Sequence, residues 1–409
     1  MKILILTAIT FLITTSCDVN DPKKDNPKPE GYQEDIPWPS LADSPWPIYH
    51  HDPQFTGRSK YAGPISGNIL WELDSLSIET SVVLGLDSTV NFLTSSHIGS
   101  LPGGLYNVNL FTGKKNWIYK ANLIANGPSP LVTADGTIII STYYDGKIFA
   151  ISKDGLLKWS FDSKSYITSG NINIDLDGNL YFADSANTLY ALNKSGTLGW
   201  KLKFENTPFG SVNTYCPFAP DGKTIFVSGY KNALYAIDIE SKSVKWFYQG
   251  EGNPKCSPIV DAQSNIYLMI RTSGDRQYLV KVNSSGKEEW RYYWGSRYPY
   301  LQTPCIDKFG NIVFGFDSLY SVDYKGKLRW KVDLNEGTIS SPVTCDINGT
   351  IYLGLSVGDY QSQVAAFSSL GNLWWKSQVL EGEPGDSPAI QNGLLLYPTY
   401  RSKKMYAIK

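Results

Sequence analysis

A pentapeptide that begins with glycine and ends with tryptophan recurs along this chain and limits the folds it can adopt. It occurs seven times, from GNILW at 67–71 to GNLWW at 371–375, and an eighth copy, KSVKW at 242–246, has lysine in place of the glycine. The repeated tryptophans are Trp71, Trp117, Trp159, Trp200, Trp246, Trp290, Trp330 and Trp375. Successive copies lie 40 to 46 residues apart, a period that is typical of repeat architectures.

Each repeat has the pattern of four short β-strands. A strand such as LYALN at 189–193 precedes every pentapeptide but the first, a second strand follows a turn, as in DGNLYFA at 177–183, and a third begins at Pro, as in SPIVD at 257–261. Proline lacks an N–H group and is tolerated at the first position of a strand. Four antiparallel strands in each unit of this length form one blade of a β-propeller. The sequence therefore predicts an all-β fold of four-stranded antiparallel blades.

The two ends of the repeat region complement each other. The last strand, MYAIK at 405–409, has no pentapeptide after it, and GNILWELD at 67–74 has no such strand before it. Pairing the two completes an eighth blade and removes the open edges of a linear array. We predict an eight-bladed β-propeller closed by residues 67–74, which join the C-terminal blade. The repeated tryptophans would fill the wedges between sheets, and the glycines would suit the tight turns.

The N-terminal region has the features of an exported protein. Lys2 precedes the apolar run 3–13, which is shorter than the roughly 20 residues of a membrane span, so residues 1–16 are predicted to be a signal peptide. The small residues before Cys17 resemble the lipobox of bacterial lipoprotein precursors, which implies that Cys17 becomes the lipidated N-terminus. Ordinary secretion with cleavage near this point is the alternative. Residues 17–43 are rich in Pro, Lys and Asp and are predicted to be a disordered tether.

Charge and residue types argue against several functional classes. The 37 basic and 38 acidic residues nearly balance, so we expect no nucleic-acid partner. With three histidines and no nucleophile or phosphate-loop motif, we predict no catalytic residues and no metal site. The HHD sequence at 50–52 is expected to be a solvated turn. The DLDGN sequence at 175–179 alternates oxygen donors as calcium loops do, but it is expected to be a plain turn.

Four cysteines, Cys216, Cys256, Cys305 and Cys345, lie near the Pro-led strand starts of successive blades. In an exported protein they allow the disulfides Cys216–Cys256 and Cys305–Cys345. Each cysteine has a different offset from its proline, whereas a disulfide requires Cα atoms within roughly 7 Å. Buried free thiols are therefore favoured, and the pairing stays open.

The strand, turn and Gly-x-x-x-Trp unit, fullest in NVNLFTGKKNW at 107–117, resembles the tryptophan-docking repeat of the pyrroloquinoline-quinone-type (PQQ-like) propellers. The segment at 45–64 also looks like the leading segment of bacterial secreted members, so the resemblance covers a propeller domain at 44–409. It implies one of two functions. Quinoprotein dehydrogenases hold PQQ and Ca²⁺ on the propeller axis, whereas non-catalytic lipoproteins, such as the propeller subunit of the outer-membrane β-barrel assembly machine, hold partner proteins through loops. The adjacent cysteines and long inter-blade insertions of many quinoprotein alcohol dehydrogenases have no counterpart here.

An aromatic segment, WRYYWGSRYPYLQ at 290–302, stands out where one blade passes to the next. Aromatic residues and arginine are common anchors at protein interfaces. The candidate partner-binding residues are Tyr292, Tyr293, Trp294, Arg297, Tyr298 and Tyr300. A loop folded onto its own propeller and a carbohydrate-binding site are the alternatives for this segment.

The sequence thus predicts a monomeric, non-catalytic propeller lipoprotein that binds a protein partner in the bacterial cell envelope, at the outer membrane. It would contact the membrane only through its lipid anchor and would need no cofactor. The alternative is a PQQ-dependent dehydrogenase or sensor that uses the axial channel with PQQ and Ca²⁺. A carbohydrate-binding module is the second alternative.

Overall fold

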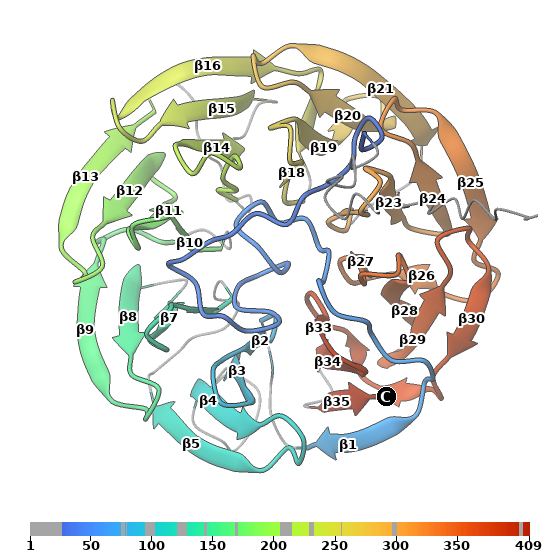
Figure 1. The fold of residues 1–409 in the computed structure, drawn as a ribbon, viewed down its shortest axis with the longest axis horizontal. Coiled ribbons are helices and arrows are strands. Elements are labelled where there is room, and N and C mark those ends of the chain that lie inside the picture. Colours follow the sequence, from blue (N-terminus) through green and yellow to red (C-terminus); the bar gives the residue numbers. More distant parts are fainter. Residues whose placement is uncertain are drawn as a thin grey trace, which may run out of the picture.

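The structure is a ring of eight antiparallel β-sheets around a central axis (Figure 1). It is a computed structural model that describes residues 27–409 except 75–77, 79, 95–102, 121–128, 143–144, 168–170, 205–214, 229–232, 255, 297–300 and 401–403. In blades 1 to 7 the main strands run in chain order from the axis to the rim, whereas in blade 8 the rim strand is β1 (Ile69–Leu73), the first strand of the chain. The predicted all-β, eight-bladed propeller is therefore confirmed. No helix long and apolar enough to cross a membrane occurs in the described ranges.

Blades 1 to 4 follow one another from the first inner strand. Blade 1 contains β2 (Val83–Leu84), β3 (Thr89–Thr94), β4 (Gly104–Asn109) and β5 (Lys115–Lys120). Blade 2 contains β6 (Leu131–Val132), β7 (Ile138–Ser141), β8 (Lys147–Ile151) and β9 (Leu157–Asp162). Blade 3 contains β10 (Asn173–Ile174), β11 (Leu180–Ala183), β12 (Thr188–Leu192) and β13 (Leu198–Lys203). Blade 4 contains β14 (Thr224–Ser228), β15 (Ala233–Asp238) and β16 (Ser243–Gln249), and a bridge from Phe218 to Ile225 holds its inner position.

Blades 5 to 8 complete the ring, and three of them carry short additional strands. Blade 5 contains β17 (Gly252–Pro254), β18 (Ile259–Val260), β19 (Ile266–Thr272), β20 (Gln277–Val282) and β21 (Glu288–Gly295). Blade 6 contains β22 (Cys305–Ile306), β23 (Ile312–Gly315), β24 (Ser318–Val322) and β25 (Leu328–Asp333). Blade 7 contains β26 (Thr338–Ile339), β27 (Thr344–Cys345), β28 (Ile351–Gly358), β29 (Gln361–Phe367), β30 (Leu373–Lys376) and β31 (Leu380–Glu381). Blade 8 contains β32 (Glu383–Pro384), β33 (Ala389–Gln391), β34 (Leu394–Tyr400), β35 (Met405–Ile408) and β1 (Ile69–Leu73).

The ring closes as the sequence predicts. Strand β1 pairs antiparallel with β35, with Leu73 opposite Met405 and Trp71 opposite Ala407. The Lys409 amide donates to the Asn68 carbonyl at 2.9 Å, which extends the pairing to the last residue. Blade 8 is thus built from both ends of the chain, and neither end leaves an unpaired edge.

In six of the pentapeptides the tryptophan ring contacts a glycine of the next blade around the ring. In every blade the register of the outermost strand shifts at the residue before this tryptophan, as at a β-bulge, which redirects a side chain. The Trp330 indole donates to the Ser369 carbonyl at 3.0 Å. A Cβ added at Gly371 (φ +85°) would lie 2.9 Å from the Trp330 ring. The glycine is therefore required by its backbone angle and also by the close approach of the ring.

The copy without glycine departs from this packing. Lys242 adopts a φ of 58° at the position where the other turns have glycine. A cavity of about 360 Å³ opens beside this turn, lined by Trp200, Ile239 and Glu240 among others. In six other turns a glycine lies against the preceding tryptophan ring with no room for a Cβ, whereas this turn has lysine at the corresponding position.

The N-terminal segment crosses one face of the ring (Figure 1). We call residues 33–43 the strap and residues 46–59 the plug. The Trp38 indole donates to the Ile174 carbonyl at 2.9 Å, and Gln33 is 1% exposed. The expected disordered tether at 17–43 is therefore wrong from Gln33 onward, because these side chains are buried against the blades. The predicted signal peptide and Cys17 lie outside the described residues.

The plug pairs with the inner strands of successive blades. Backbone amides of Leu84, Val132, Phe218, Val260, Ile306 and Cys345 donate to plug carbonyls at 2.8–3.0 Å, so six blades hold it by main-chain bonds. The strap and plug lie on the face that carries the turns after the inner strands, since Ala134 donates to the Ser40 carbonyl. We call this the plug face. The loops that join one blade to the next lie on the opposite face.

Candidate functional site

A ring of small residues surrounds the propeller axis, one at the start of each inner strand. It consists of Ser81, Ser129, Asn171, Cys216, Ser257, Thr303, Ser341 and Ser387, all between 0% and 3% exposed. Neighbouring blades are linked through it, because the Ser387 amide donates to Ser81 Oγ at 3.0 Å and the Ser81 amide donates to Ser129 Oγ at 3.1 Å. We call this set the inner ring.

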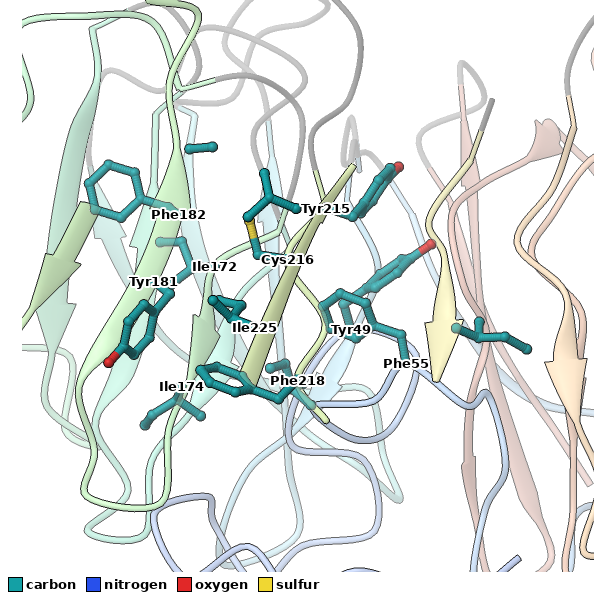
Figure 2. Packing of buried hydrophobic residues seen from close by; sticks show 14 of the residues in the cluster. Tyr49, Phe55, Ile172, Ile174, Tyr181, Phe182, Tyr215, Cys216, Phe218 and Ile225 are labelled. Atoms are coloured by element: carbon teal, nitrogen blue, oxygen red, sulfur yellow. The ribbon is translucent and has the colours of Figure 1, made fainter. Parts of the chain in front are cut away.

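Two plug side chains reach the inner ring. Tyr49 Oη lies 2.9 Å from Thr303 Oγ1, and its ring stacks on Tyr215 with centroids 5.8 Å apart (Figure 2). His50 Nε2 lies 2.9 Å from the Pro304 carbonyl oxygen, and Nδ1 lies 3.2 Å from Ser387 Oγ. A carbonyl only accepts, so Nε2 carries the proton and Nδ1 accepts from the serine hydroxyl.

Burial controls the charge of His50. The side chain is fully buried, and burial lowers its pKa from 6.5 to about 4, although the bond to Pro304 and the charge of Asp52 oppose this. The histidine is therefore neutral at physiological pH. The HHD sequence is not the solvated turn predicted from the sequence, because the backbone of the plug turns His50 (φ 54°) inward.

Asp386 brings a carboxylate to this region. Burial raises its pKa, although hydrogen bonds from Ser81, Ser387 and Ser129 oppose the shift. The Ser387 amide donates to Asp386 Oδ1 at 2.9 Å. The axial region thus has neutral hydroxyl, amide and thiol groups around one carboxyl group, whose pKa is raised by burial.

These residues do not fit PQQ and its calcium ion. PQQ is a planar quinone with three carboxylates, so a site for it needs compensating cations, and Ca²⁺ needs six to eight hard oxygen ligands. Among the inner ring, Tyr49, His50, Tyr215 and Asp386, no residue is Arg or Lys and one is acidic. The described residues also contain no group of three or more His, Cys, Asp or Glu side chains placed to hold a metal ion.

The structure places the residues of the predicted aromatic site in different environments. Trp294 is 8% exposed and packs edge-on against Phe314 and Tyr320, with centroids 5.7 and 5.9 Å away. Tyr292 contacts the same two rings. Tyr293 is 51% exposed. Trp294 and Tyr292 therefore belong to the core between blades 5 and 6, whereas Tyr293 faces solvent. The remaining three candidates, Arg297, Tyr298 and Tyr300, lie outside the described residues.

Exposed tyrosines also occur near the opposite face. Tyr166 follows β9 on the way to blade 3 and is 56% exposed, and Tyr360 lies between β28 and β29 and is 55% exposed. Sequence reasoning missed both because they lie outside the dense aromatic segment. The available signal in the sequence was a tyrosine that follows the end of a predicted strand.

The other motifs behave as simple structural features. The four cysteines at 216, 256, 305 and 345 are buried free thiols, as favoured from the sequence. In the DLDGN turn, Asp175 accepts hydrogen bonds from the Asp177 and Asn179 amides and from the Tyr181 hydroxyl. The carboxylate is therefore occupied by its own turn, as the plain-turn interpretation predicted.

The inner ring and the plug are the features that sequence reasoning did not identify as a site. In six blades the inner-ring residue directly precedes the proline of the Pro-led strand, so the repeat itself marked its position. The plug contacts had no such mark, since they join backbone atoms.

Comparison with known proteins agrees with this architecture. A model of the family described as "Outer membrane protein assembly factor BamB" matches residues 61–292, more than half of the chain. The chain belongs to the BamB family. BamB from Moraxella catarrhalis aligns with a TM-score of 0.61 and 15% identity, over 83% of this chain and 99% of that one. The strap and plug precede the residues matched to the family.

The same fold occurs in enzymes. Quinohemoprotein alcohol dehydrogenase from Comamonas testosteroni aligns with a TM-score of 0.64 and 12% identity, over 90% of this chain and 81% of that one. Lambda-carrageenase from Pseudoalteromonas carrageenovora is 24% identical over 202 residues, or 46% of this chain. That match spans 21% of the carrageenase. At these identities the structural likeness shows the fold and leaves the activity open.

Proposed function

We propose that this BamB-family chain is a non-catalytic scaffold of the bacterial cell envelope that binds a protein partner through the face opposite the plug. The observation that carries the proposal is the occupation of the axis by the plug. Tyr49 and His50 fill the space beside the inner ring and pair with Thr303, Ser387 and Pro304. A dehydrogenase of this fold holds its quinone on the axis, where these neutral groups offer it little.

The opposite face suits a protein partner. The eight sheets form a rigid support, and loops on such a support change without disturbing the core. Tyr166, Tyr293 and Tyr360 supply exposed aromatic surface there, and tyrosine is enriched among residues that dominate binding energies. The centre of the plug face is already covered by the strap and plug.

Membrane attachment is a second part of the proposal. A lipid on Cys17 would hold the ring at the outer membrane, with the strap starting 16 residues further on, at Gln33. The Cys17→Ser variant should lose palmitate label and leave the membrane fraction. Retention of the variant in membranes, together with an unlabelled wild type, would show that the lipoprotein assignment is wrong.

Site-specific photo-crosslinking tests the binding face. A crosslinking amino acid is placed at Tyr166, Tyr293 or Tyr360 in cells that make the full chain. Matched controls carry it in exposed turns of the plug face, at Phe111, Leu156 and Leu370, which are 53% to 70% exposed. One discrete crosslinked envelope protein from the first set, absent from the controls, supports the proposal. Equal crosslinking from both sets, or none from the first, contradicts it.

A cofactor assay separates the scaffold from the enzyme alternative. PQQ and Ca²⁺ are titrated into the purified chain by calorimetry, followed by dye reduction with alcohols and sugars. The neutral axial residues lead us to expect neither binding nor turnover. Micromolar binding with substrate-dependent dye reduction would favour the dehydrogenase.

A further inference from the structure

A cavity of about 680 Å³ lies on the plug face between the strap and the plug. The turns that follow three inner strands complete its wall, with Leu86, Ala134 and Ala262. Its volume is in the range of pockets that hold small ligands, roughly 300–1,000 Å³. Most of its lining precedes residue 61, where the match to the BamB family begins. The cavity is therefore built by the part of the chain that the family match leaves out.

The charged groups in the wall compensate one another. Arg58 Nη1 lies 2.6 Å from Asp35 Oδ1, and Lys60 Nζ lies 3.6 Å from Asp43 Oδ1. The other two carboxylates also have partners in the chain: Glu34 pairs with Lys28, and Asp52 with His51 and Thr56. A wall whose charges are already paired gains little from a charged ligand, because binding one would desolvate an ion without a free counter-ion. This favours an uncharged ligand.

Two side chains of the wall have buried donors without acceptors. Gln54 is 2% exposed and Arg58 is 6% exposed, and Gln54 Nε2 and Arg58 Nε have no hydrogen-bond partner among the described residues. A buried donor left unpaired costs about 1–3 kcal/mol. Both residues line the cavity, so a ligand oxygen that reaches either donor would satisfy it. The ligand should therefore carry oxygen atoms.

The rest of the wall is apolar and stiff. It includes four prolines, together with Trp38 and Leu41; the prolines are Pro37, Pro39, Pro47 and Pro53. Proline fixes the backbone angle φ, so the shape of the cavity costs little additional entropy when a ligand binds. Apolar surface beside paired polar groups suits a ligand that has apolar C–H faces and hydroxyl groups at its edges.

We propose that this cavity binds an uncharged saccharide of one or two rings. Its ring oxygens and hydroxyls accept from Gln54 and Arg58, its hydroxyls donate to the carboxylate of Asp52, and its C–H face rests on the prolines. The site is separate from the partner-binding face, which lies on the other side of the ring.

Saturation-transfer difference NMR on the purified chain tests the ligand class. The probes are glucose, galactose, maltose and lactose, with glucuronate and glucosamine as charged counterparts of glucose. We expect saturation transfer to at least one neutral sugar, and at least tenfold weaker binding of glucuronate and glucosamine than of that sugar. No transfer to any neutral sugar, or stronger binding of the charged ones, overturns the proposal.

Variants connect binding to the cavity. Ala134→Trp places a large side chain at the mouth of the cavity from an exposed position, and Ala186→Trp makes the same change at an exposed turn that does not line it. Gln54→Met removes one donor while keeping a similar shape. The first and third variants should raise the dissociation constant at least tenfold, and Ala186→Trp should leave it unchanged. If Ala134→Trp binds as the wild type does, the sugar site is elsewhere and the proposal fails, whether or not Gln54→Met folds.

Discussion

Neutral His50 inside the plug makes the stability of the protein depend on pH. The folded-state pKa of about 4 lies below the 6.5 of the unfolded chain because burial disfavours the imidazolium. Between these values the unfolded state binds a proton that the folded state does not. Stability therefore rises with pH through this window, is fully present above 6.5 and is lost progressively as the pH falls toward 4.

The magnitude follows from the two pKa values. Each unit is worth 1.36 kcal/mol, so a difference of about 2.5 units removes roughly 3 kcal/mol in full, and about 2 kcal/mol has been lost at pH 5. The His50→Gln variant separates this effect from the titration of carboxylates. Glutamine offers an N–H to the Pro304 carbonyl and an oxygen to the Ser387 hydroxyl, but it does not titrate.

Urea unfolding followed by tryptophan fluorescence measures the effect. The free energy of unfolding is determined for wild type and His50→Gln at about pH 7.5, 6 and 5. The difference between the two proteins should change by about 2 kcal/mol between the highest and lowest pH, in favour of the variant at low pH. Parallel pH profiles for the two proteins would refute the reasoning, because His50 would then titrate alike in the folded and unfolded states.

Five further changes test the packing of the ring, each by the free energy of unfolding. Trp330→Ala should cost roughly 3 kcal/mol by opening a wedge between blades 6 and 7, and an unchanged stability would contradict the role of the repeat. Lys242→Gly should raise the free energy of unfolding by about 0.5–1 kcal/mol, because glycine adopts a left-handed backbone conformation without strain. Gly371→Ala should lower it by at least about 1 kcal/mol, because the added Cβ would meet the Trp330 ring. Changes of the same sign in these two variants would contradict the role of glycine in the turn. Deletion of 405–409 should cost several kcal/mol and cause aggregation through the freed edges of β34 and β1, so a monomer of native stability would argue against the closure. Trp38→Ala should cost about 3 kcal/mol because the strap packs on blade 3, and a neutral result would restore the disordered tether.

Two contacts show how much of the blade structure could be predicted from the sequence. The pairing of β1 with β35 was predictable because an unpaired strand remained at each end of the repeat, and a closed ring satisfies both edges. The contact of Trp330 with Gly371 was predictable in part. The repeat indicated that this tryptophan lies between blades. Whether a Cβ at position 371 would overlap the Trp330 ring depends on how closely the neighbouring blade approaches.

The candidate site was less accessible from the sequence. Trp294 looked like an interface anchor because it lies in a dense aromatic segment, and its burial depends on Phe314 and Tyr320 of the next blade. The approach of Asp386 to Ser81 and Ser129 joins blade 8 to blades 1 and 2, far apart in the chain. Local patterns carry no information on such distances.

The sequence by itself determined the all-β class, the number of blades and their closure. The same pattern of strands and turns recurs in every repeat, so each repeat independently predicts the same four-stranded sheet. Only the tertiary structure decided what fills the axis and what covers the plug face. The strap and plug occur once, have no hydrophobic period and bind largely through backbone carbonyls and amides, which every residue type supplies. His50 is buried and neutral for the same reason: its environment is made by Pro304 and Ser387, more than 250 residues away in the chain.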